Sequence, residues 1–315
     1  MPSQHPIRFG LQTVTENVAW QELVKIWSFA EGLGYDSLWT SDHFVTSIFP
    51  EKPDVPVLDG WTALAGLAVL TERVRLGVMI TGNPYRHPPQ LAKIATTLDQ
   101  MSGGRLTLGI GAGWHELEHR MYGVPYYGNA ERAHRLGEAL QVISLLWTEK
   151  RANFDGKYYQ LEDAICEPKP LQQPRIPIWV GGWGEKVVLR DAAKYADGWN
   201  TTGSPETLAH KAEVFRRHCE DANRDFDAME KSIMHLGLFE SDDPDEIQRF
   251  LNSKRVPVDY KDQFMVGTHE QMRESIARYI ELGFTHFVCQ VAPPYDYNAI
   301  KGWYTEVAQA FKTAT

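Results

Sequence analysis

The sequence predicts an α/β fold, a closed (β/α)8 TIM barrel that forms a single domain over residues 1–315 with insertions in its βα loops. Eight short, β-rich apolar segments alternate with longer amphipathic segments along almost the whole chain. The short segments are continuously apolar rather than alternating, which is typical of parallel strands that helices cover on both faces. A doubly wound open sheet is the second architecture that this pattern allows.

The first half of the chain contains four of the expected βα units. Residues 7–13 form the first predicted strand because a polar N-terminus leads directly into an apolar run. The predicted helix at residues 18–31 ends at Gly32 and Gly34, since glycine favours the conformation that follows a helix. The other elements expected here are strands at 37–41, 74–81 and 105–111, helices at 62–70, 89–101 and 131–147, and a loop containing Pro50, Pro53 and Pro56.

The second half repeats the alternation after an interruption. Residues 148–174 are rich in Tyr and Pro and are expected to be irregular, and the acidic residues 241–257 are expected to form a loop. The remaining elements are strands at 176–180, 198–202, 233–239 and 286–291, and helices at 185–195, 205–221, 270–282 and 297–311.

Composition narrows the classes of function. The 315 residues are 43% hydrophobic and 23% charged, as in ordinary globular proteins, and the net charge of −9 gives no reason to expect nucleic acid or an anionic membrane as a partner. Cys166, Cys219 and Cys289 lie far apart and are interpreted as reduced thiols. The N-terminus shows no signal peptide, and the longest apolar run, residues 61–70, is too short to span a bilayer, so we expect a cytoplasmic protein.

A barrel places its active site at the C-terminal ends of its strands, in the βα loops. Polar and glycine-rich segments follow four of the predicted strands, at residues 40–43, 80–83, 111–114 and 181–184. The two glycine-rich segments differ from the G-x-G-x-x-G and G-K-[ST] patterns, so they point to neither a Rossmann site nor ATP chemistry. They are interpreted either as tight turns or as backbone N–H groups presented to one anion.

Residues 115–119, HELEH, match the H-E-x-x-H pattern of zinc peptidases. Such a site needs two histidines one turn apart on a helix and a third ligand downstream, for which Glu131 or Glu138 would serve. However, Gly123 and Pro125 interrupt any helix soon after the motif. We therefore interpret the match as accidental and expect no metal.

Two further groups of residues are candidates for chemistry. Asp42 and His43 follow the second strand, where a histidine faces the barrel mouth and can exchange a proton near neutral pH, and where Asp42 can bind a polar ligand or set the tautomer of the histidine. Tryptophans near strand ends can line a pocket for a planar ring, and we assign Trp61 and Trp114 to a substrate pocket. The loops at residues 45–59 and 241–260 are expected to cover it.

Four segments carry a resemblance to a known family: SDHF at residues 41–44, the run from VRLGVMITGN to GIGAGW at 74–114, FDGKYY at 154–159 and PIWVGGWGE at 177–185. In this order they resemble the bacterial luciferase-like monooxygenase superfamily, and most of all its branch of coenzyme F420-dependent oxidoreductases. The likeness extends over nearly the whole chain. It implies a barrel that binds a deazaflavin or flavin at the C-terminal ends of the strands.

The resemblance also implies roles for particular residues. His43 would be the catalytic residue at the reacting carbon, and Asp42 would contact the cofactor. A bulge with a non-prolyl cis peptide would lie at Met79–Ile80. The other residues expected to bind the cofactor are Thr81, Gly111, Ala112, Gly113, Gly181, Gly182, Trp183 and Gly184.

The chain departs from the glucose-6-phosphate dehydrogenases of this branch in two places. Those enzymes carry a glutamate after the glycines of the fourth strand, where this chain has Trp114, and a tryptophan after SDHF, where it has residues 45–47, VTS. These differences argue against a sugar phosphate as substrate.

The leading hypothesis is an F420-dependent oxidoreductase that transfers a hydride between deazaflavin C5 and a small organic substrate, with His43 assisting proton transfer. The alternatives are an FMN-dependent monooxygenase that uses reduced flavin and oxygen, and a barrel that has lost catalysis and only binds. A homodimer is expected from the resemblance alone.

Overall fold

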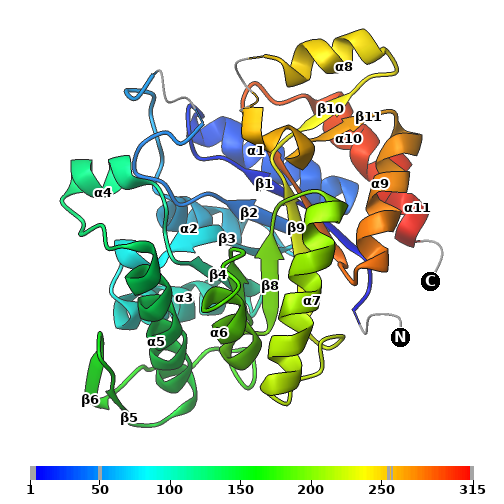
Figure 1. Cartoon of the computed structure of the whole chain (residues 1–315). Helices are drawn as coiled ribbons and strands as arrows, with labels where there is room; N and C mark the ends of the chain where they lie inside the picture. The colour runs from blue at the N-terminus through cyan, green and yellow to red at the C-terminus, as the bar shows by residue number, and fades with distance from the viewer. Residues whose placement is uncertain (1–4, 49–51, 254–255, 257, 313–315) are drawn as a thin grey trace.

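The protein forms a closed barrel of parallel strands in the order β1-β12-β9-β8-β7-β4-β3-β2, which confirms the predicted (β/α)8 class (Figure 1). The computed structural model describes residues 5–48, 52–253, 256 and 258–312, so Pro50 and parts of both expected covering loops lie outside the described residues. The barrel strands are β1 (Arg8–Thr13), β2 (Ser37–Thr40), β3 (Arg75–Gly82), β4 (Leu106–Gly111), β7 (Ile178–Gly181), β8 (Gly198–Thr201), β9 (Glu230–His235) and β12 (His286–Val291).

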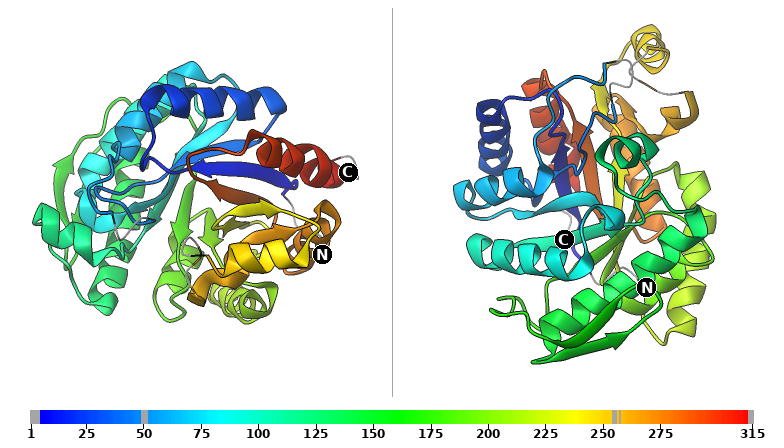
Figure 2. Two further views of the ribbon diagram at one scale, coloured as in Figure 1. Left: turned by 90° about the horizontal axis from the view of Figure 1, so that it is seen from above. Right: turned by 90° about the vertical axis from the view of Figure 1, so that its left-hand side faces the viewer.

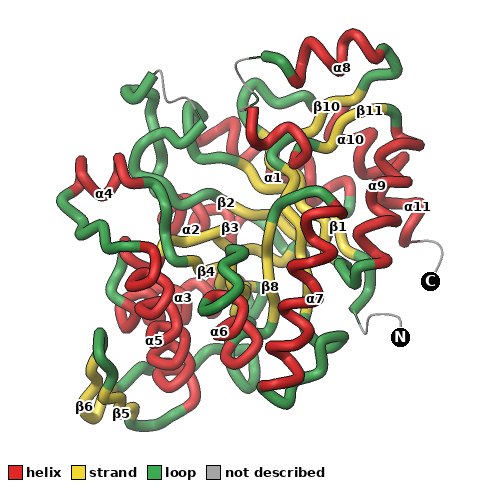
Figure 3. The backbone as a smooth tube through the Cα atoms, viewed as in Figure 1, coloured by secondary structure: helices red, strands yellow, loops and turns green. Residues whose placement is uncertain are grey.

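Helices form an outer layer around these strands, as the view from above and the tube coloured by secondary structure show (Figures 2 and 3). They bury apolar faces against the outside of the barrel, which explains why the strands are apolar on both faces. The helices that follow barrel strands are α1 (Trp20–Leu33), α2 (Gly60–Leu70), α3 (Pro88–Ser102), α5 (Asn129–Thr148), α6 (Val188–Tyr195), α7 (Pro205–Asp221), α9 (His269–Glu281) and the C-terminal series α10 (Tyr297–Gly302), η3 (Trp303–Ala308) and α11 (Gln309–Lys312).

The interior of the barrel is filled with side chains. The rings of Trp39 and Trp179 stack with centroids 5.0 Å apart, and Met79 and Val288 pack against them. Trp39 also donates a hydrogen bond from its indole nitrogen to Ser37 (2.9 Å), whose hydroxyl lies 2.7 Å from the ring of His286. Large rings therefore fill the barrel, and a ligand has room only at its open end.

Three expectations about the second half were wrong. Residues 148–174 contain an antiparallel hairpin of β5 (Ala152–Asp155) and β6 (Gln160–Ala164), and residues 241–257 contain the helix α8 (Pro244–Leu251). The strand expected at 233–239 is divided between β9 and β10 (Leu238–Glu240), which pairs with β11 (Met265–Gly267) outside the barrel. The acidic composition of α8 hid an N-terminal signal, since Asp243 caps the helix and Pro244 is its first residue.

Insertions lie at the two ends of the barrel. In Figure 1 the arrow of β8 points upward, α4 (Glu116–Tyr122) and α8 lie toward the top, and the β5–β6 hairpin lies at the bottom. The elements added at the top therefore stand beside the C-terminal ends of the strands. No helix among the described residues is long and apolar enough to cross a membrane.

Gly109 in β4 offers a test of the packing between neighbouring strands. A Cβ atom at this position would lie 2.3 Å from the carbonyl oxygen of Val78, so we expect Gly109→Ala to lower the free energy of unfolding by about 1–3 kcal/mol. In the matched control Gly32→Ala, the new Cβ meets no heavy atom within 4 Å, and helix propensity predicts a gain of up to about 1 kcal/mol. Urea denaturation of both variants measures the difference, and equal effects would contradict the packing account.

Candidate active site

Asp42 lies directly after β2 and is fully enclosed, with 2% of its surface exposed. Arg86 donates from Nη1 to both oxygens of this carboxylate, at 2.8 and 3.0 Å, and the hydroxyl of Thr81 donates to Oδ2. Burial raises the pKa of Asp42, while Arg86 and Thr81 favour its charged form. Arg86 also binds Asp59 at 2.8 Å, so its charge is shared between two carboxylates.

Trp61 contacts Thr81, one of the residues that bind Asp42. Its indole nitrogen donates to the Thr81 hydroxyl at 3.0 Å, and only 3% of the residue is exposed. Trp61 therefore fixes Thr81, and its place in a substrate pocket stays a prediction. Sequence reasoning missed Arg86 and Asp59, because nothing in the sequence indicated that a buried carboxylate after β2 would need a cation.

The structure confirms the cis peptide predicted at Met79–Ile80. It lies in β3 where the register against β4 shifts between Val78 and Thr81, and the side-chain amide of Gln12 donates to the Met79 carbonyl. Cβ atoms built on Gly109, Gly111 and Gly181 would lie 2.9, 3.1 and 2.7 Å from atoms of the Ile80 side chain. These glycines therefore make room for the Ile80 side chain.

The two glycine-rich turns have unequal hydrogen-bonding capacity. Gly113 and Gly182 have φ angles of +76° and +133°, which favour glycine. The Gly182 amide donates to the Asn200 carbonyl at 3.1 Å, so it is not offered to a ligand. The amides of Trp183 and Gly184, by contrast, donate to no group among the described residues, and the Trp183 residue is 46% exposed. Of the residues in this turn, Trp183 and Gly184 therefore keep backbone donors that no described group uses.

His43 is held by Glu118, which the sequence analysis had not included in the site. The Nδ1 atom of His43 lies 2.6 Å from Oε1 of Glu118, which also accepts a hydrogen bond from the Tyr85 hydroxyl at 3.0 Å. Burial disfavours a charge on His43, but the Glu118 carboxylate offsets it and the pKa of His43 is raised. Burial likewise opposes the charge on Glu118, yet its donors, His43 foremost, lower its pKa.

Glu118 belongs to the HELEH segment, whose members have separate partners. His115 precedes α4, and its ring lies 5.8 Å from that of His43, whereas the Nδ1 of His119 lies 3.0 Å from the Pro125 carbonyl. Across the described part of the chain, no three His, Cys, Asp or Glu side chains are grouped to hold a metal ion. The absence of a zinc site at this motif stays a prediction, and Glu118 makes its contact with His43 instead. The sequence signal that could have indicated Glu118 as a site residue was an acidic residue on a short helix directly after β4.

Trp114 stands at the rim of the site. It is 61% exposed, its ring meets that of His43 edge to face with centroids 5.8 Å apart, and its carbonyl accepts a hydrogen bond from Tyr126 at 3.1 Å. The position predicted to replace a catalytic glutamate thus presents an aromatic surface beside His43.

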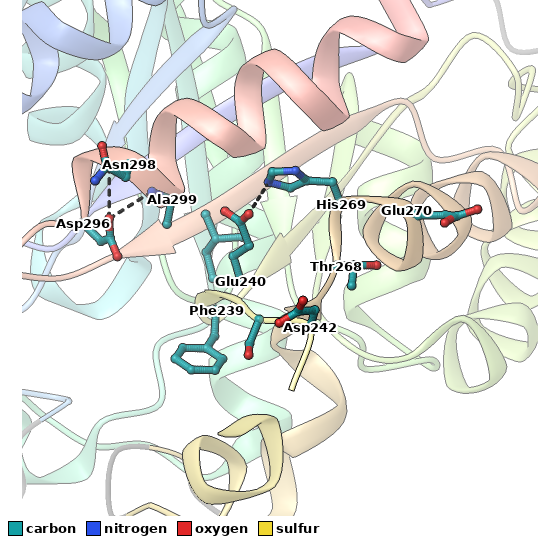
Figure 4. A pocket seen from close by; sticks show the side chains of 11 residues that line it. Phe239, Glu240, Asp242, Thr268, His269, Glu270, Asp296, Asn298 and Ala299 are labelled. Atoms are coloured by element: carbon teal, nitrogen blue, oxygen red, sulfur yellow. Dashed lines mark hydrogen bonds and ion pairs between the residues drawn. The ribbon is translucent and has the colours of Figure 1, made fainter. Parts of the chain in front are cut away.

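A separate depression of about 670 Å³ lies between β10, α9 and α10, and none of the predicted site residues lines it (Figure 4). Some of its polar groups bind one another: His269 pairs with Glu240 at 3.0 Å, and Asp296 caps α10 through the amides of Asn298 and Ala299. Because the predicted site residues gather at another place on the barrel, the depression is not the candidate active site.

The fold and this geometry define a class of barrel with a bulge in β3, glycines in β4 and β7 that face it, and a histidine after β2 that a carboxylate holds. Residues 3–255 match the model of the luciferase-like monooxygenase family, and the chain belongs to that family. It is 31% identical to the F420-dependent glucose-6-phosphate dehydrogenase of Microbacterium testaceum, over 90% of this chain and 91% of that protein.

Solved structures agree with this assignment. The fold superposes on an F420-dependent secondary alcohol dehydrogenase in complex with an F420–acetone adduct, with a TM-score of 0.83, 25% identity and coverage of 98% of this chain and 99% of the other. It also matches the F420-dependent tetrahydromethanopterin reductase from Methanopyrus kandleri in fold, with a TM-score of 0.79 at 20% identity, covering 98% of this chain and all of that chain. The two F420-dependent dehydrogenases among these relatives support the predicted F420-dependent branch more than the FMN alternative.

Removal of Arg86 tests the account of Asp42. In Arg86→Met the enclosed carboxylate loses its cation, and we expect the free energy of unfolding at pH 7 to fall by about 3–5 kcal/mol. Arg151→Met is the matched control, because the Arg151–Asp163 pair is exposed, with side chains 51% and 64% accessible, and is expected to contribute less than about 1 kcal/mol. Denaturant titration of both variants compares the losses, and a small loss in Arg86→Met would refute the role given to Arg86.

Proposed function

We propose that this protein is an F420-dependent oxidoreductase that transfers a hydride between deazaflavin C5 and a small alcohol or carbonyl compound. The observation that carries the proposal is the placement of His43, with its Nδ1 bound by Glu118, on the rim that also holds the Asp42–Thr81 pair and the Met79–Ile80 bulge. The F420-dependent relatives support it.

The residues at the rim fit a planar cofactor with an anionic arm. Ile80, backed by Gly111 and Gly181, offers an apolar surface for a ring, and Ala112 and Gly113 continue it along the end of strand 4. The amides of Trp183 and Gly184 suit a phosphate. Asp42 and Thr81 bond to each other and are enclosed, so their contact with the cofactor stays a prediction from the resemblance. When bound, F420 supplies a carbon that accepts or donates a hydride.

His43 would manage the proton that accompanies this hydride. Its Nε2 atom forms no hydrogen bond with a described residue, and the side chain retains 16% exposure. An imidazole with one nitrogen anchored and the other open can accept the hydroxyl proton of an alcohol or donate a proton to a carbonyl oxygen. The protein thus contributes orientation and a positioned acid or base.

A neutral substrate fits this site better than a sugar phosphate. The indole of Trp114 offers an apolar surface beside His43, and Arg86 is already bound to Asp42 and Asp59. One domain, a cytoplasmic location, a homodimer and the absence of a nucleic-acid partner remain predictions from the sequence.

A cofactor titration tests the proposal. We expect fluorescence titrations of the purified protein to show tight binding of F420 and weaker binding of FMN and FAD. His43→Ala should keep much of the F420 affinity and lose about 10²–10⁴-fold in kcat, the usual contribution of general acid–base catalysis. Tight FMN binding without F420 binding, together with oxygen consumption by reduced FMN, would favour the monooxygenase instead.

A substrate comparison tests the neutral pocket. With F420 present, 2-propanol should reduce the cofactor with a higher kcat/KM than glucose 6-phosphate, because the described rim offers an aromatic surface in place of an uncommitted cation. Absorbance of F420 follows the reaction. A preference for glucose 6-phosphate would show that the Trp114 position does not exclude a sugar phosphate.

A further inference from the structure

Three donors converge on the carboxylate of Glu118. Its Oε1 meets Nδ1 of His43 at 2.6 Å and the Tyr85 hydroxyl at 3.0 Å, and its Oε2 meets the backbone amide of Phe44 at 2.5 Å. The Glu118 side chain is completely enclosed. Because an amide nitrogen and a phenol donate, and because an ionised carboxylate can only accept, Nδ1 of His43 must carry a hydrogen.

We propose that Glu118 is a positioning residue for His43, which keeps a proton on Nδ1 and leaves Nε2 as the atom that exchanges a proton with the substrate. The role of His43 in this inference rests on the function proposed above. Glu118 reaches His43 from α4, a short helix inserted after strand 4, so two βα loops are tied at the reacting histidine.

The arrangement is like that of a catalytic triad, in which a carboxylate orients the imidazole without becoming protonated itself. In alcohol oxidation Nε2 of His43 would accept the hydroxyl proton, and F420, when bound, would supply the acceptor for the hydride of the C–H bond. In carbonyl reduction Nε2 would return the proton to the oxygen, and the reduced cofactor would supply the hydride. The proton on Nδ1 stays in place in either direction. Glu118 stabilises the imidazolium that forms.

Other charged groups near His43 also affect its protonation. Glu16, in the loop after β1, and Asp42, on the same strand end, both favour a protonated His43, while His115 opposes it. Glu118 is the acid in direct hydrogen-bond contact with the ring. Its removal should therefore change the titration of His43 more than the removal of any other acid.

A purely structural role is the competing explanation, since Glu118 also anchors the Phe44 amide. The two roles differ in what they do to the imidazole. A loop anchor predicts altered stability with an unchanged pKa of His43, whereas a positioning residue sets both the tautomer and the pKa.

Nuclear magnetic resonance of the protein with ¹⁵N- and ¹³C-labelled histidine distinguishes the positioning role from the purely structural one. The His43 signal is assigned by its loss in His43→Ala. In the wild-type protein we expect the neutral form to carry its hydrogen on Nδ1. In Glu118→Gln the pKa of His43 should move downward, because the charge that stabilises the imidazolium is gone. In Glu116→Gln, an exposed acid on the same helix, the pKa should stay at the wild-type value.

Two results would overturn the inference: a wild-type His43 that carries its neutral hydrogen on Nε2, or a Glu118→Gln variant whose His43 titrates like the wild type. The first needs no variant, so it holds even if Glu118→Gln fails to fold. The measurement uses the protein without cofactor, so a failure to bind F420 would refute the proposed function and leave this result standing.

Discussion

The site depends on carboxylates that are enclosed by protein and therefore need donors to replace water. Asp42 receives Arg86 and Thr81, and Glu118 receives His43, Tyr85 and the Phe44 amide. A third, Glu16, accepts from the hydroxyl and the amide of Ser47 at 2.8 and 2.9 Å. Each carboxylate joins loops that follow different strands, so the loops after β1, β2, β3 and β4 are held together at one rim.

The packing of strands beneath this rim depends on glycines rather than on carboxylates. The bulge in β3 turns Ile80 toward neighbouring strands, and glycine at positions 109, 111 and 181 is what lets those strands approach it. Gly111 and Gly181, which belong to the segments interpreted as possible anion sites, thus make room for Ile80. The amides of residues 183–184 have no partners among the described residues, and it is on these amides that the proposed anion binding rests.

Much of this could be predicted from the sequence, and the rest could not for identifiable reasons. The continuously apolar strands predicted the barrel, and the resemblance predicted His43, Asp42 and the Met79–Ile80 peptide, which the structure brings to one rim. Helix α8 was missed because its acidic composition resembled a loop. Glu118 and Arg86 were missed because their partners lie 75 and 44 residues away in the chain, and no local pattern reports such contacts.

In the function proposed above, His43 works at the reacting carbon of a deazaflavin. A crystal structure of the protein with F420 and a substrate alcohol tests it most directly. The account predicts a ring packed on Ile80, with the alcohol oxygen within hydrogen-bond distance of His43 Nε2 and the Glu118 contact retained. A ring bound away from Ile80, or an alcohol oxygen that meets another side chain while His43 stays distant, would contradict it.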